Sequence, residues 1–113
     1  MASILEEITA RKRRDLTLVK EQHPARELYR EVEEMMDHDA HHSLPQALLE
    51  SATGIIAEFK RKSPSLGWIR EEARPEDIVP QYAAHGATAL SILTDEPYFG
   101  GRSEYITRVR PLV

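Results

Sequence analysis

The sequence predicts an α/β fold in which a helical N-terminal part precedes two strand–helix units. Two observations lead to this prediction. Apolar residues follow a helical spacing up to about residue 50, and a strand-like alternation in two later stretches, about residues 55–60 and 87–94. The segment between these stretches has the length of a right-handed crossover that contains one helix, so the two strands should be parallel.

The N-terminal part, residues 1–50, should consist of helices. A first helix is expected from residue 3 to about residue 21, because Ser3 and Glu6 match a capping box and His23-Pro24 interrupts the pattern. A second helix is expected from about Ala25 to Met36, and a short third helix from Pro45 to about Glu50.

Residues 51–113 should form the two strand–helix units. The first strand is expected at about Ile55 to Lys60, followed by a loop that extends to Arg74. The next helix should begin near Asp77, because the proline at position 80 is tolerated only in a first turn, and should end at Gly86.

The second strand is expected at Ala87 to Thr94, and a last helix should begin near residue 103. Alternation along this strand assigns its side chains to two faces. One face carries Leu90 and Ile92, and the other carries Ser91 and Leu93.

Composition limits the class of protein. The chain has 113 residues, 41% of them hydrophobic and 30% charged, which indicates one modest globular domain. The net charge of −4 argues against nucleic acid as a partner. There are no cysteines, no apolar run near the ~20 residues that span a bilayer, and no signal-peptide pattern. We therefore expect a cytoplasmic protein without a membrane partner.

Two charges of opposite sign end the first predicted strand. Glu58 and Lys60 are two residues apart, so alternation places their side chains on the same face. Ionisable groups that point inward at a strand end are costly unless a ligand or partner uses them. In parallel α/β folds, ligands bind at the carboxyl ends of the strands. The pair is therefore a candidate site, and a solvated ion pair is the alternative interpretation.

Glu58 and Lys60 lie within the first of two longer motifs. The motifs read AEFKRKSPS at residues 57–65 and SILTDEPYFGG at residues 91–101. Together they closely resemble indole-3-glycerol phosphate synthase, an enzyme of tryptophan synthesis built on a (β/α)8 barrel. The resemblance covers nearly all of the chain. It implies that the chain is the N-terminal fragment of a TIM barrel, with a helical extension plus two βα units.

The resemblance also implies a reaction and a set of site residues. The substrate would be a sugar phosphate joined to an anthranilate ring, which closes to indole-3-glycerol phosphate with loss of carbon dioxide and water, without a cofactor. Glu58 and Lys60 match catalytic positions, and Lys60 would also hold substrate anions. Ser63, Leu93 and Phe99 match positions that line the substrate pocket. From the residues alone, Ser63 equally fits the start of a turn, Phe99 equally fits packing against the fold, and Leu93 fits a core position.

Other parts of the family's machinery have no counterpart in these residues. The resemblance places the main general acid on the third strand, the main general base on the fifth, and the phosphate-binding loops after the seventh and eighth. A barrel of this class needs eight strands and about 250 residues. We therefore expect a fragment that is inactive alone and that associates with itself or pairs with the missing C-terminal part, because two parallel strands leave both edges open.

Three further signals are given structural interpretations. The stretch DHDAHH at residues 37–42 is rich in metal-ligand types, but a short loop between helices does not predict a metal site. The basic run at residues 11–14 spreads around a helix and reads as a solvated face. Trp68, in the first strand–helix loop, should pack against a neighbouring element.

Overall fold

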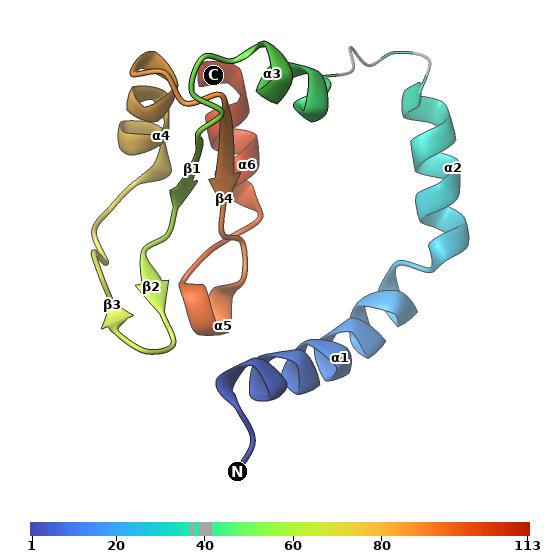
Figure 1. Cartoon of the computed structure of the whole chain (residues 1–113). Coiled ribbons are helices and arrows are strands. Elements are labelled where there is room, and N and C mark those ends of the chain that lie inside the picture. Colours follow the sequence, from blue (N-terminus) through green and yellow to red (C-terminus); the bar gives the residue numbers. More distant parts are fainter. Residues whose placement is uncertain (37, 39–41) are drawn as a thin grey trace. The chain divides into compact units, whose positions relative to one another are not determined.

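The computed structural model describes residues 1–36, 38 and 42–113. The chain divides into two compact units, Met1–His42 and Ser43–Val113, and each is described by itself (Figure 1). No helix in the described part combines the length and apolar character that crossing a membrane requires.

The first unit consists of α1 (Ile4–Gln22) and α2 (Ala25–Met36), close to the predicted bounds. The capping box is confirmed: Glu6 accepts a hydrogen bond from the Ser3 backbone N–H at 2.6 Å, and the Ser3 hydroxyl accepts one from the Glu6 N–H at 3.2 Å. Neither helix has a buried residue among those described. Apart from the half-buried Ile8, their large apolar side chains are exposed.

The second unit begins with α3 (Leu44–Glu50), capped by the Ser43 hydroxyl. Its centre is a two-stranded parallel sheet of β1 (Ile56–Phe59) and β4 (Ala89–Ile92), connected through α4 (Pro75–Ala84). In Figure 1 the two strands lie side by side and point the same way. The predicted parallel strand–helix–strand unit is confirmed.

The predicted start of α4 is wrong by two residues. The helix begins at Pro75, with Arg74 as N-cap, and Pro80 lies in its interior. Proline at the first helical position suits the fixed φ of its ring. Pro80 removes one helical hydrogen bond. Val79, which is only 1% exposed, gains burial that offsets this loss.

The two loops beyond the parallel strands contain short elements that the sequence did not predict. A hairpin of β2 (Lys62–Ser63) and β3 (Gly67–Trp68) follows β1. The single turn of α5 (Glu96–Phe99) follows β4, with Asp95 as its N-cap. The chain continues through α6 (Glu104–Val109) and the short 3₁₀ helix η1 (Arg110–Leu112).

The core lies on one face of the parallel sheet, beneath α4 and α6. It consists of Phe59, Ala73, Val79, Tyr105 and Val109. The ring of Phe59 meets that of Tyr105 edge-on, with centroids 6.1 Å apart. Leu90 and Ile92, which the alternation assigned to one shared face, both pack against this core. The opposite face, which we call the open face, has Ile56 half exposed at 51%.

Candidate functional site

Glu58 and Lys60 lie on the open face at the carboxyl end of β1, and both side chains are exposed. Phe59, between them, is 3% exposed and belongs to the core. The alternation of a strand explains this arrangement, because successive side chains point to opposite faces. The structure therefore places the two charged residues together on one face.

Glu58 has a defined partner on the neighbouring strand. It lies opposite Ser91 in the parallel register, and the Ser91 hydroxyl donates a hydrogen bond of 2.9 Å to Glu58 Oε2. Ser91 was not among the predicted site residues. Its signal in the sequence was a hydroxyl in an otherwise apolar strand, on the face opposite Leu90 and Ile92.

Lys60 makes no ion pair or hydrogen bond within the described part of the chain, so it is not paired with Glu58 there. A lysine ammonium is a compact cation with three hydrogen-bond donors. The open face thus presents a positive charge that is available to an anion, beside a carboxylate already held by a neutral hydroxyl.

Ser63 is 7% exposed and lies in the β2–β3 hairpin. Its hydroxyl accepts a hydrogen bond from the Leu66 N–H at 3.1 Å and lies 3.5 Å from the Ser65 hydroxyl. This geometry gives Ser63 a role in closing the turn after Pro64, as the second interpretation of the sequence proposed.

Arg61 joins the loop after β1 to the loop after β4. Its guanidinium donates to the Gly100 carbonyl at 3.2 and 3.0 Å and to the Glu71 carbonyl at 2.6 Å. It also lies 5.1 Å from the centroid of the Trp68 ring. One planar side chain with several fixed donors therefore holds both loops.

Gly100 completes this contact between the loops. Its φ of 60° favours glycine, and a Cβ there would lie 2.7 Å from the Trp68 ring. Trp68 therefore packs against a neighbouring element, which confirms the prediction for it. The Lys62 ammonium also reaches across to the Pro97 carbonyl at 3.4 Å.

Leu93 and Phe99 both follow the carboxyl end of β4, and both are half-buried. The Leu93 N–H donates to the Phe59 carbonyl at 3.2 Å, which extends the strand pairing by one step. Phe99 is the last residue of α5, whose start is held by a hydrogen bond of 3.0 Å from the Tyr98 N–H to Asp95. Both residues are thus carried to the same end of the sheet as Lys60.

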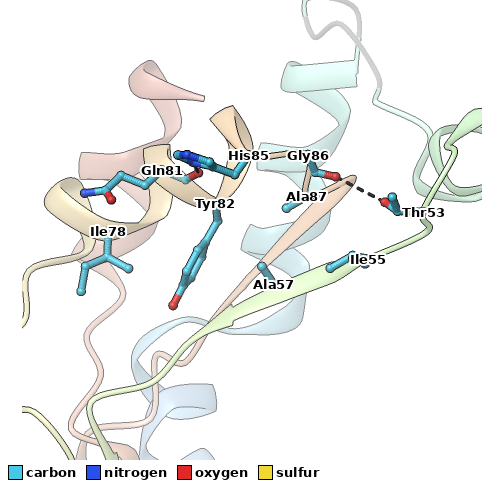
Figure 2. Close-up of a pocket in the computed structure, with 9 residues that line it drawn as sticks. All are labelled: Thr53, Ile55, Ala57, Ile78, Gln81, Tyr82, His85, Gly86 and Ala87. Atoms are coloured by element: carbon cyan, nitrogen blue, oxygen red, sulfur yellow. Dashed lines mark hydrogen bonds between the residues drawn. The ribbon is translucent and has the colours of Figure 1, made fainter.

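A pocket on the other side of the sheet contains none of these residues. It lies between β1 and α4, and Figure 2 shows Tyr82 and Ile78 from the helix facing Ala57 of the strand. Thr53 closes one end by donating to the Gly86 carbonyl at 3.4 Å. Its walls are largely apolar and its chemistry is that of a packing groove, so we do not assign the reaction to it.

The metal-ligand stretch of the sequence lies mostly outside the described residues, because Asp37, Asp39, Ala40 and His41 are not among them. Within residues 1–36, 38 and 42–113, no three His, Cys, Asp or Glu side chains are grouped closely enough to hold a metal ion.

Comparison with known proteins identifies the family of this chain. The model of the family "Indole-3-glycerol phosphate synthase" matches residues 5–113. Relatives with that name are 52% identical over 113 residues in Bacteroides thetaiotaomicron, 41% over 113 in Carboxydothermus hydrogenoformans and 39% over 111 in Azoarcus. The alignments cover 100%, 96% and 97% of this chain, but only 42%, 43% and 42% of the relatives. The chain therefore belongs to the indole-3-glycerol phosphate synthase family.

Proposed function

We propose that these 113 residues form the helical extension and first two βα units of an indole-3-glycerol phosphate synthase barrel. The complete barrel would convert carboxyphenylamino-deoxyribulose phosphate to indole-3-glycerol phosphate, with loss of carbon dioxide and water. The observation that carries the proposal is that Glu58 and Lys60 are both exposed on one face at the carboxyl end of β1, within a family match to residues 5–113. In a barrel, this end of the strands forms the active-site face.

Each site residue has a role that its position supports. The ammonium of Lys60 binds an anionic group of the substrate, and this interaction assists catalysis when the charge of that group changes. The carboxylate of Glu58 orients the polar groups around it and assists proton transfer. Phe99 and Leu93 supply apolar surface for the rings. Ser63 acts at the mouth of the pocket through the turn that it closes.

The described strands supply only part of such a site. The general acid, the general base and the phosphate loops would come from segments that correspond to the remainder of the relatives. Residues that act as a unit lose most of the rate when one is removed. We therefore propose that this chain alone does not turn over the substrate.

A chimera tests the proposal. The chain would replace the matching N-terminal 42% of the Bacteroides thetaiotaomicron relative, to which it is 52% identical. Synthase activity in the chimera, absent from the 113-residue chain alone, is the expected result. An inactive chimera that folds as well as the relative would count against the function, and turnover by the chain alone would contradict its dependence on other segments.

A second candidate is a non-catalytic assembly module, favoured by the unpaired surfaces of the second unit. In the described residues β1 pairs only with β4, so each strand has a free edge. The groove of Figure 2 is also an open apolar surface, next to the edge strand β1. Free strand edges and exposed apolar surface favour association with another chain. The occupant is either a second copy or the remainder of the barrel.

Light scattering of the 113-residue chain, with and without the complementary part of the relative, distinguishes these occupants. Homo-oligomers that persist when the complementary part is added support the assembly module. A one-to-one complex that regains synthase activity supports the barrel. A compact monomer at high concentration, with no complex on mixing, would rule out both forms of association.

A further inference from the structure

We infer that Ser91 is a positioning residue that holds the Glu58 carboxylate on the β4 side of the open face, so that Lys60 stays free to bind an anion. The expected effect of Ser91 on catalysis rests on the proposed function. The positioning itself rests on the hydrogen bond of 2.9 Å from the Ser91 hydroxyl to Glu58 Oε2 and on the register that sets the two residues opposite each other.

Glu58 has a competing partner on its own strand. Residues two apart on one face of a strand are separated by about 6.6 Å, which two long side chains of opposite charge readily span. Lys60 occupies that position, yet the two are not paired among the described residues. The Ser91 hydroxyl provides Glu58 with an alternative partner across the sheet.

The Ser91 hydroxyl is also a suitable kind of partner for the Glu58 carboxylate. A hydroxyl donates a hydrogen bond to a carboxylate but carries no charge, so it fixes the orientation of Glu58 without neutralising it. A lysine or arginine at position 91 would instead form an ion pair. Neutral fixation leaves both the negative charge of Glu58 and the positive charge of Lys60 available to a ligand.

The fold does not otherwise require a hydroxyl at this position. Leu90 and Ile92, the neighbours of Ser91 in β4, pack against the core, whereas Ser91 points to the open face. Valine and threonine both favour strands and have nearly the same shape. Replacing Ser91 by either one therefore compares the hydroxyl with a methyl group in one steric setting.

The experiment compares Ser91→Val with Ser91→Thr in the chimera. Loss of one hydrogen bond to a charged group predicts a kcat about tenfold to a hundredfold lower for Ser91→Val, with KM nearly unchanged. Ser91→Thr should retain most of the activity. Both should unfold at similar temperatures. Equal activity of the two variants, or equal loss, would overturn the inference.

Two further measurements separate positioning from other roles. In a Glu58→Ala background, Ser91→Val should cause no additional loss, because the group that it positions is gone. An undiminished additional loss would contradict the inference. Crystal structures of the two variants give a readout without activity: the carboxylate should stay beside residue 91 in Ser91→Thr and leave it in Ser91→Val. An unmoved carboxylate overturns the inference, whereas an inactive unsubstituted chimera counts only against the proposed function.

Discussion

The two faces of the parallel sheet differ in what they do, although the same two strands form both. Toward α4 and α6, Phe59 is 3% exposed and belongs to the core. On the open face, its neighbours Glu58 and Lys60 are exposed. One face of β1 thus stabilises the fold, and the other carries the polar groups of the candidate site.

This difference means that stability and chemistry can be changed separately here. Charged groups on an exposed face keep their hydration, so they cost little while no other segment covers them. Covering the open face, in a barrel or an oligomer, would add the desolvation cost and strengthen every electrostatic interaction on it. Substitutions on the two faces should therefore give effects of different kinds.

The largest effect is expected for Phe59→Ala. Truncating a buried aromatic side chain costs about 3–5 kcal/mol, a large part of the stability of a small domain. Ile56→Ala is the matched control, because Ile56 lies on the open face of the same strand and is 51% exposed. Urea unfolding of the 113-residue chain should show a small change for Ile56→Ala. A large change there would indicate that another copy covers the open face in solution.

Lys60→Met should affect activity and leave the fold intact. Removing the cation that binds a substrate anion should lower kcat/KM of the chimera about tenfold to a hundredfold, mainly through KM. The free energy of unfolding should change by less than about 0.5 kcal/mol. Lys20→Met, on the exposed surface of α1, is the control and should leave kcat/KM unchanged. Unaltered kinetics in Lys60→Met would remove Lys60 from the site.

Arg61→Lys should weaken the contact between the two loops. A lysine cannot reproduce the fork that reaches the Glu71 and Gly100 carbonyls together. The expected loss is about 1–2 kcal/mol, with faster amide exchange of Gly101, whose N–H donates to the Asp95 carbonyl. Arg70→Lys is the control, since Arg70 is 63% exposed and pairs with Glu72 at the surface. Equal effects of the two substitutions would contradict a specific role for Arg61.

The sequence predicted the elements whose signals are local and repeated. The capping box of Ser3 and Glu6, the alternation in β1 and β4, and the parallel crossover are all confirmed. The β2–β3 hairpin was missed because two-residue strands are too short to show alternation. The start of α4 was misplaced because Pro80 is accommodated in the helix interior, and Pro75, whose fixed φ suits the first helical position, begins the helix two residues earlier.

The candidate site, like the fold, could be predicted from the sequence only in part. Alternation placed Glu58 and Lys60 on one face, but no periodicity identifies the partner across the sheet. The pairing of Glu58 with Ser91 depends on the register, which becomes known only when the strands are in place. The same holds for Arg61, whose contacts are with Glu71 and Gly100, ten and 39 residues away.

The smallest effect is expected from pH, at an ion pair on the core side that is unrelated to the open face. Glu76 of α4 accepts a hydrogen bond of 2.8 Å from Arg108 of α6 and one of 3.3 Å from Arg74. A hydrogen bond with its own backbone, followed by those from Arg108 and Arg74, lowers the pKa of Glu76, and burial opposes this shift. The helix interface is therefore strongest while Glu76 is ionised.

The lowered pKa of Glu76 determines how stability changes with pH. Because the pKa is lower in the folded state than in the unfolded state, the contribution to stability is complete above about pH 4.3 and is lost as the pH falls through the folded pKa. A partly exposed ion pair of this kind contributes about 1 kcal/mol or less. Unfolding in urea at about pH 6 and about pH 3 should therefore show the wild type losing its advantage over Glu76→Gln in acid. An advantage that persists unchanged at the lower pH would mean that the charge of Glu76 does not hold α4 against α6.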